Sequence, residues 1–468
     1  MSFLPDSEPV RVPCPYIFLT ILQSVFFFVT SVERSDRLHA IRLHEKTIRP
    51  LPAVSTVPIS FPTRKPRRMR VLDNRSRRAL TSVMNGSAEQ ATILDLFCGV
   101  GGFSLGAVRA GFRLIGSVDW DKDALRMHAV NFPGSQHWNA DLSRVSAQDI
   151  RERFQFKQVD GVIGGPPCQG FSRMGHQRPD DSRNRLFVQF FALVADLKPK
   201  FFLAENVLGL LDAKNHPLVK RALARVRPEY DVLPPLILTA SRYGVPTTRT
   251  RVFIFGVRKD LGVKVSENDI LKGMPRSEKV TVAEALSGLP ERIRASSGNS
   301  DDSGWRKLSA RCRRKGFFFK RIEGCIPPGV GDLDSINRLV NCSEVSGNQG
   351  TIHNSDVKTR WSKLKQGKQD SVSKARRLES NGFCHTIRAG TGRDMGSFQS
   401  LRPIHPTANR VITPREAARL QSFPDWFQFD STKWQSFRQI GNSVCPVLAE
   451  KILVSIKSMM EKSDEKHS

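Results

Sequence analysis

The stretch ATILDLFCGVGGFSLG, residues 91–106, decides the fold of this chain of 468 residues. Its first seven residues form a short apolar run, which predicts a buried β-strand. The glycines that follow predict a sharp turn, and the residues after them have helical spacing. A strand that passes through such a turn into a helix presents backbone amides to a ligand at the positive end of the helix. The stretch therefore predicts the first strand and the ligand-binding turn of an α/β domain.

The same alternation of strands and helices continues beyond this stretch, and it predicts a mostly parallel sheet covered by helices on both faces. After Val257 the alternation fades, and helical spacing resumes only at residues 413–423 and 443–460. The further strands are expected at residues 112–118, 159–165, 200–206, 229–238 and 251–257, with helices at residues 121–132 and 183–197.

The loss of strand–helix alternation after Val257 divides the chain into parts. A structureless loop as long as residues 259–409 is uncommon inside a compact domain, so we expect a second, irregular domain inserted there. The expected parts are an N-terminal extension at 1–90, a catalytic and cofactor-binding domain at 91–258, the inserted domain at 259–409, and a C-terminal part at 410–468 that completes the catalytic domain.

The composition points to a polyanionic partner. Lys and Arg number 73 against 45 Asp and Glu, a formal net charge of +28. A basic surface that is merely solvated is the alternative, but an excess of this size favours a nucleic acid. The eight cysteines show no zinc-binding spacing and no disulfide framework, so no metal and a reducing, cytoplasmic compartment are expected.

The N-terminal extension allows three interpretations. Residues 16–32 are mostly apolar and just long enough for a membrane span, and an Arg-rich stretch follows them. The extension is a membrane anchor, an organelle-targeting segment, or upstream sequence wrongly joined to a gene that starts at Met69 or Met84. We favour the third interpretation, because organised patterning begins only at Ala91, and we expect no membrane partner.

Polar and aromatic residues after the first strands indicate a nucleotide-like cofactor. Asp119 lies 20 residues after Gly99, where ribose hydroxyls are usually bound. The dinucleotide fingerprint would need glycine where Ser104 stands, which counts against a nicotinamide cofactor. Trp120 offers a flat face to an adenine, although it could equally be a core aromatic, and Asp141 could accept from the adenine amino group.

Three further segments carry reactive side chains at the same edge of the predicted sheet. Cys168 follows two prolines in GGPPCQGFS, residues 164–172, a setting that suits an exposed nucleophile better than a buried structural cysteine. Glu205 ends a strand in apolar surroundings, where a carboxyl group can stay protonated and donate. Arg249 and Arg251 stand two apart at the start of the last strand, and strand alternation predicts that they share a face.

These segments together resemble the cytosine-5 DNA methyltransferase family of bacterial type. They occur in the family's order and cover about residues 91–258 and 410–457. One departure is Thr247, where the family usually has Gln. The matching segments are DLFCGVGGFSLG (95–106), VDWD (118–121), ADL (140–142), GGPPCQGFS (164–172), AENV (204–207), RYGVPTTRTRVFIFG (242–256), RVITPREAARLQSFPD (410–425) and QIGNSVCP (439–446).

The resemblance implies a Rossmann-like methyltransferase sheet and a set of catalytic roles. The Cys168 thiolate would add to C6 of a cytosine flipped out of the duplex, under a lid formed by residues 171–185. Glu205 would bind N3 and the exocyclic amine, and Arg251, with Arg249 beside it, would steady the O2 side. Asn206 would orient the Pro-Cys loop.

The resemblance also implies S-adenosylmethionine as the methyl donor, with the late motif closing its pocket. The base that removes the C5 proton is not identified by any motif. The residues expected to hold the cofactor are Phe97, Gly99, Gly101, Gly102, Asp119, Trp120, Asp141, Leu142, Pro166, Leu186, Asn442 and Ser443.

The inserted region occupies the place of the family's target-recognition domain. Its basic runs at residues 305–321 and 359–368 would bind phosphates of double-stranded DNA. We expect a nucleoid-associated monomer, with a cognate restriction endonuclease as a second candidate partner. Two alternatives stay open: a tRNA cytosine-5 methyltransferase of the same family, and a non-catalytic DNA-binding regulator. The large basic insertion favours duplex DNA, and the intact Cys168, Glu205 and Arg251 favour an enzyme.

Overall fold

The computed structural model describes most of the chain from Gln90 onward. The predicted N-terminal extension lies outside the described residues. In the part of the chain that is described, no helix is long and apolar enough to cross a membrane. The described residues are 90–167, 182–274, 276–293, 304–309, 316–323, 326–390 and 400–467.

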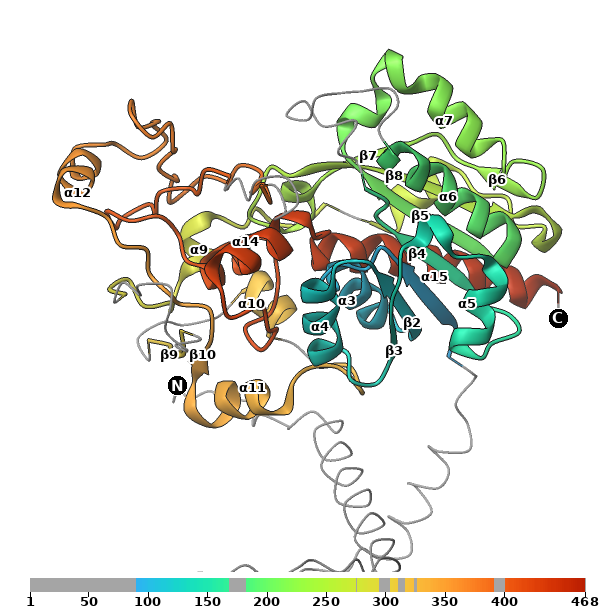
Figure 1. The fold of residues 1–468 in the computed structure, drawn as a ribbon, viewed down its shortest axis with the longest axis horizontal. Coiled ribbons are helices and arrows are strands. Elements are labelled where there is room, and N and C mark those ends of the chain that lie inside the picture. Colours follow the sequence, from blue (N-terminus) through green and yellow to red (C-terminus); the bar gives the residue numbers. More distant parts are fainter. Residues whose placement is uncertain are drawn as a thin grey trace, which may run out of the picture. The chain divides into compact units, whose positions relative to one another are not determined.

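An eight-stranded sheet forms the centre of this part of the chain, in the order β3-β2-β1-β4-β5-β8-β6, with β7 also paired to β8 (Figure 1). The strands from β3 to β5 run parallel, and β8 runs antiparallel to β5, β6 and β7. The predicted α/β fold is therefore confirmed. The strands are β1 (Thr92–Leu96), β2 (Arg113–Asp119), β3 (Gln136–Asn139), β4 (Gly161–Gly164), β5 (Phe201–Asn206), β6 (Tyr230–Val232), β7 (Leu236–Thr239) and β8 (Thr250–Arg258).

Helices cover both faces of the sheet, because side chains alternate along each buried strand. Ile93 of β1 and Leu203 of β5 belong to the core beneath α3 and α15, whereas their neighbours Leu94 and Phe202 belong to the core beneath α5, α6 and α7. The helices are α3 (Gly102–Arg109), α4 (Lys122–Asn131), α5 (Ala147–Phe154), α6 (Ser182–Leu197), α7 (His216–Leu223), α13 (Pro414–Leu420), α14 (Lys433–Asn442) and α15 (Pro446–His467).

The last helix, α15, packs directly on the first described helix, α3. A Cβ atom at Gly106 would lie 2.4 Å from Cβ of Ala449 and 2.7 Å from the backbone nitrogen of Glu450. Because only glycine leaves room for this approach, the two helices lie closer than side chains normally permit. The C-terminal residues thus share one core with the first strand.

Two features of the sheet differ from the expected strands. Residues 229–238, expected as one strand, form the short strands β6 and β7, because Pro234 and Pro235 between them lack backbone donors. Strand β3 was not predicted, since its four residues, QHWN, are polar apart from Trp138 and pair only at the sheet edge.

Residues 259–409 contribute only short elements to the described part of the chain. A small separate core of Trp361, Ala375 and Ile404 lies among them. Their assignment as a target-recognition domain stays a prediction. The elements are α8 (Glu267–Lys272), α9 (Val282–Leu286), β9 (Arg306–Lys307), α10 (Phe317–Ile322), α11 (Leu333–Asn337), the π-helical turn Arg338–Cys342, β10 (Glu344–Val345) and α12 (Ser355–Ser362).

Candidate active site

The carboxyl ends of the parallel strands gather most of the predicted site residues. Strands β1, β2, β4 and β5 end at Leu96, Asp119, Gly164 and Asn206, and their parallel pairing places these ends at one edge of the sheet. In open α/β sheets this edge is where ligands bind. The predicted cofactor turn and the predicted catalytic carboxylate therefore share an edge.

The turn between β1 and α3 adopts a conformation that side chains rarely allow. Phe97, Gly99 and Gly101 have φ angles of 65°, 55° and 101°. Such a conformation is costly at the non-glycine Phe97, and backbone strain of this kind is concentrated at functional sites. The backbone amides of this turn lead directly into the N-terminus of α3.

Asp119 fastens this turn to the next strand. Its Oδ2 accepts a hydrogen bond from the Gly99 amide and its Oδ1 from the Asp121 amide, both at 2.8 Å. Burial raises the pKa of Asp119 to about 6, against the lowering effect of these two bonds. The carboxylate that the sequence assigns to a ribose thus also holds the shape of the glycine turn.

The two other predicted adenine contacts lie near the surface. Trp120 is 59% exposed, which excludes its alternative interpretation as a core aromatic. Asp141 caps a short 3₁₀ turn, Leu142–Arg144, by accepting from the Ser143 amide at 3.0 Å, and Leu142 itself is buried. An exposed indole beside Asp119 offers a free flat surface at the sheet edge.

The C-terminal motif closes this edge from the other side. A Cβ atom at Gly102 would lie 2.3 Å from the Val444 carbonyl oxygen and 3.0 Å from Cβ of Ser443. Ser443 is buried and donates through Oγ to the Gln439 carbonyl at 2.7 Å, whereas Asn442 is exposed at the end of α14. Ser443 therefore lies next to the glycine turn, and Asn442 directly precedes Ser443 in the chain.

Glu205 and Arg251 form an ion pair at the end of β5. Nε of Arg251 lies 2.8 Å from Oε1 of Glu205, in a geometry that is an ion pair rather than a well-aligned hydrogen bond. Glu205 is 8% exposed, and its Oε2 lies 3.5 Å from the place that a Cβ atom at Gly165 would occupy. The carboxylate thus faces the start of the Pro-Cys loop.

Asn206, for which the family resemblance implies a role in orienting the Pro-Cys loop, makes a hydrogen bond to that loop. Its Nδ2 donates to the carbonyl oxygen of Pro166 at 3.3 Å. Pro166 is buried and Leu186 on α6 is half-buried. Cys168 and the predicted lid up to residue 181 lie outside the described residues.

Arg249 has contacts that differ from those of Arg251. It is 3% exposed, and its Nη1 donates to the carbonyl oxygens of Gly441 at 3.0 Å and Ile387 at 3.4 Å. The guanidinium therefore joins the start of β8 to the C-terminus of α14. The charges of Arg249, Arg251 and Glu205 all act on the buried thiol of Cys445, whose pKa burial raises to about 11.

A buried polar network, which the sequence did not predict, lies beneath the glycine turn. Ser104 Oγ donates to Asp95 Oδ2 at 2.5 Å and lies 2.9 Å from His128 Nε2, and His128 Nδ1 lies 2.9 Å from His137 Nε2. Burial raises the pKa of Asp95 to about 8 and lowers that of both histidines. The one available signal was an aspartate inside the apolar run ATILDLF.

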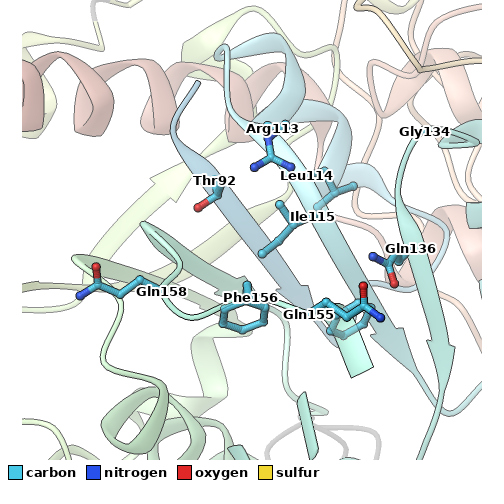
Figure 2. A pocket seen from close by; sticks show the side chains of 10 residues that line it. Thr92, Arg113, Leu114, Ile115, Gly134, Gln136, Gln155, Phe156 and Gln158 are labelled. Carbon is cyan, nitrogen blue, oxygen red and sulfur yellow. The ribbon is translucent and has the colours of Figure 1, made fainter. Parts of the chain in front are cut away.

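A cavity of about 230 Å³ opens at the opposite edge of the sheet (Figure 2). Thr92, Arg113 and Gln136, at the starts of β1, β2 and β3, help to line it. None of the predicted site residues lines this cavity, so we do not assign the cofactor to it. Among the described residues, no cluster of His, Cys, Asp and Glu could hold a metal ion.

The chain matches known proteins along most of its described length. The model of the family C-5 cytosine-specific DNA methylase matches residues 91–458. The Type II methyltransferase M.XorII of Xanthomonas oryzae pv. oryzae is 36% identical over 383 residues, which cover 80% of this chain and 86% of the relative. M.AgeI of Thalassovita gelatinovora is 31% identical and covers 78% of this chain and 98% of its own. A crystal structure of a DNA modification methyltransferase encoded within an E. coli prophage shares 46% identity with a TM-score of 0.72, covering 79% of this chain and 99% of that one.

Proposed function

Because the chain belongs to the C-5 cytosine-specific DNA methylase family, we propose that it methylates cytosine through a covalent bond between Cys168 and the base. The enzyme is a DNA (cytosine-5-)-methyltransferase with Type II methyltransferases among its relatives. The observation that supports the site most directly is the Glu205–Arg251 pair beside the Pro-Cys loop, on the sheet edge that also holds the glycine turn.

The residues at the glycine turn fit S-adenosylmethionine. A Cβ atom at Gly99 would have no neighbour within 4 Å, so the turn is open to close approach there, and the exposed Trp120 offers a face for an adenine. The bound cofactor would supply an electrophilic methyl group. Asp119 would receive the ribose while it keeps the turn in shape, and Asn442 would contact the cofactor from the other side, with Phe97, Gly102, Asp141, Leu142, Pro166, Leu186 and Ser443 completing the pocket.

Cys168 would make C5 of the target base reactive. Its thiolate would add to C6 of a cytosine that has left the base stack, which shifts electron density to C5. After C5 has gained the methyl group, loss of the C5 proton and β-elimination of the thiolate would restore the aromatic ring. Asn206 would hold the loop that carries Cys168, through its hydrogen bond to Pro166.

Glu205 and Arg251 would stabilise the charge that develops in the ring. Their side chains are only 10% and 13% exposed, so the pair acts in surroundings from which most water is excluded. Glu205 would bind N3 and the exocyclic amine, and Arg251 would face O2. Arg249 would support them from behind, because its hydrogen bonds tie β8 to Gly441 and Ile387.

DNA containing 5-fluorocytosine tests this mechanism, because a fluorine at C5 blocks the final elimination. With S-adenosylmethionine, the full chain should form a denaturant-resistant adduct with duplex DNA, and Cys168→Ala should form none. An adduct of equal yield with Cys168→Ala would refute the role of the thiol. Transfer of tritiated methyl to tRNA but not to duplex DNA would favour the tRNA alternative. Bound DNA without transfer to either would favour the non-catalytic regulator.

The finer expectations about partners and location belong to the same proposal. We propose a monomer that acts in the cytoplasm on the nucleoid, with a cognate restriction endonuclease as a second component. The net charge of +28 supports association with DNA. Gel filtration of the full chain and sequencing of its bisulfite-treated host DNA would test the first two of these expectations.

A further inference from the structure

A rigid hairpin in the region after α12 carries an exposed apolar tip among basic side chains. The residues from Lys368 to Arg377 form it: the Arg377 amide donates to the Lys368 carbonyl at 2.9 Å, and the Asp370 amide donates to the Ala375 carbonyl at 2.8 Å. At the tip, Val372 is 67% exposed. Its side chain is therefore accessible to a partner at the tip of the hairpin.

Asp370 fixes the conformation of this tip from inside. It is 1% exposed and accepts from the Ser373 amide at 2.8 Å and from Ser373 Oγ at 2.5 Å. Arg360 of α12 binds the same carboxylate with two hydrogen bonds, at 2.7 and 3.1 Å, and holds the pKa of Asp370 well below its usual range. The tip is therefore pre-organised, which lowers the entropy that a partner must overcome.

Arg377 anchors the base of the hairpin. It is 4% exposed and donates through Nη1 to the carbonyl oxygens of His405 at 3.2 Å and Pro406 at 3.3 Å, and through Nη2 to Oδ1 of Asn409 at 2.8 Å. Trp361 of α12, whose carbonyl also accepts from Nη2, packs with Ala375 in the small core beneath. The hairpin is thus tied to α12 at both its base and its tip.

The chain that leaves this hairpin docks at the catalytic edge of the sheet. The Cys384 amide donates to the Pro246 carbonyl at 2.9 Å, and the Thr248 amide donates to the Cys384 carbonyl at 2.8 Å. Pro246 and Thr248 directly precede β8, the strand of Arg251. The segment that follows the hairpin thus contacts the residues that lead into the strand of Arg251.

The surface around the hairpin is strongly basic. Residues 355–378 hold eight Lys or Arg and only two Asp, and Arg360 already neutralises Asp370. The side chains of Lys358, Lys363, Lys365, Lys368, Lys374 and Arg376 are exposed. The basic run at residues 305–321 is a weaker candidate for DNA contact. Phe318 and Phe319 of α10 are buried, and Arg321 pairs with Glu450 at 3.1 Å.

We propose that this hairpin reads the target sequence: Val372 contacts base edges in the major groove of the substrate DNA, and Lys368 and Lys374 bind the flanking phosphates. This inference rests on the proposed function. An apolar side chain in the major groove favours the methyl group of thymine, and the exposed Ser371 can bond to any base. The lysines fix register without sequence preference.

The test uses the full chain and a library of duplexes with a fixed cytosine in randomised flanks, followed by bisulfite sequencing. Val372→Thr keeps the shape of the side chain but adds a hydroxyl group. We expect it to change the relative methylation of sites at one flanking position by about tenfold. It should leave the melting temperature unchanged. An unchanged preference at every position would overturn the assignment of Val372.

A double variant separates phosphate binding from net charge. Lys368→Gln with Lys374→Gln should weaken binding to all duplexes alike and reduce the slope of log affinity against log salt by about 2. Lys220→Gln with Arg221→Gln, exposed on α7, removes the same charge elsewhere and should leave the slope unchanged. Equal losses of affinity and salt dependence in both double variants would overturn the assignment of Lys368 and Lys374 to phosphate binding. If the wild-type chain methylates no duplex at all, it is the proposed function that fails.

Discussion

Arg438 of α14 and Asp121 at the start of α4 form an ion pair, with 2.5 Å between Nη1 and Oδ2, across 317 positions of sequence. Asp121 also donates its amide to Asp119, and Asp119 in turn accepts from the Gly99 amide. A single line of contacts therefore joins the glycine turn, the loop of Trp120 and the helix that ends at Asn442. This pair therefore links the two sides of the proposed cofactor site.

Arg438→Gln should weaken S-adenosylmethionine binding by up to about fivefold, the loss expected for one partly exposed ion pair. Affinity for DNA should change little, because the pair lies on the cofactor side. Isothermal titration with each ligand measures the two effects. Arg126→Gln is the comparison variant, since Arg126, which is more exposed than Arg438, also joins α4 to the C-terminal region by its pair with Asp430 at 2.5 Å. Equal losses in both variants would show a general weakening of the interface instead.

Glu205→Gln should lower kcat by about 100-fold or more, because the variant can neither transfer a proton nor pair with Arg251 as an anion. Binding of S-adenosylmethionine should remain within twofold of wild type. Single-turnover methylation of a duplex measures the chemical step. The control is Glu229→Gln, which breaks an exposed pair with Lys198 and should leave kcat unchanged. A variant at position 205 with full activity would remove this carboxylate from the mechanism.

Asp95→Asn should change how the free energy of unfolding depends on pH. Burial raises the pKa of Asp95 to about 8 from an unfolded value near 3.8, so the unfolded chain loses its proton first as pH rises. Between pH 6.5 and 8 the wild type should lose up to about 1.4 kcal/mol of stability per pH unit from this group, and the variant should not. This window lies above the pKa of about 6 for Asp119, which therefore adds little to the slope.

Urea unfolding at pH 6.5, 7.5 and 8.5 measures this dependence. Asparagine preserves the acceptor for Ser104 Oγ, so the network to His128 can persist. Asp231→Asn, at an exposed position on β6, should follow the wild type across the range. Parallel pH profiles for the wild type and Asp95→Asn would contradict the assignment.

Gly106→Ala should destabilise the enzyme by about 1–3 kcal/mol, although alanine is the better helix former by about 1 kcal/mol. The added Cβ would lie 2.4 Å from Cβ of Ala449, so α3 and α15 must move apart. Thermal unfolding measures the loss. The double variant Gly106→Ala with Ala449→Gly should recover part of it, because the nearest obstacle is removed. No recovery would point to the backbone of Ala449 and Glu450 as the dominant obstacle.

The elements that the sequence predicts best are those whose local pattern matches their environment. Strands β1, β4 and β5 are short apolar runs buried on both faces, and a run of that kind indicates a strand without further information. Strand β3 carries no such run, because it lies at the sheet edge. The break between β6 and β7 could have been predicted from Pro234 and Pro235.

The site residues likewise divide into those that local sequence predicts and those that tertiary packing brings together. Asp119 and Glu205 were recognisable because each ends a predicted strand, so their positions followed from local sequence. The contacts of Arg249 with Gly441 and Ile387, and of Asp121 with Arg438, join residues more than a hundred positions apart. No local pattern encodes such contacts. The buried network of Asp95, Ser104, His128 and His137 is likewise a product of tertiary packing.

Val444 and Ala449 pack against Gly102 and Gly106, so the proposed methyl-donor pocket needs residues that the ribosome adds more than 300 positions after its glycine turn. Cys168, Glu205 and Arg251 are all translated before that second wall exists. We therefore expect a nascent chain to remain inactive until α15 has been made and has packed on α3. A chain truncated upstream of α15 should be inactive as well.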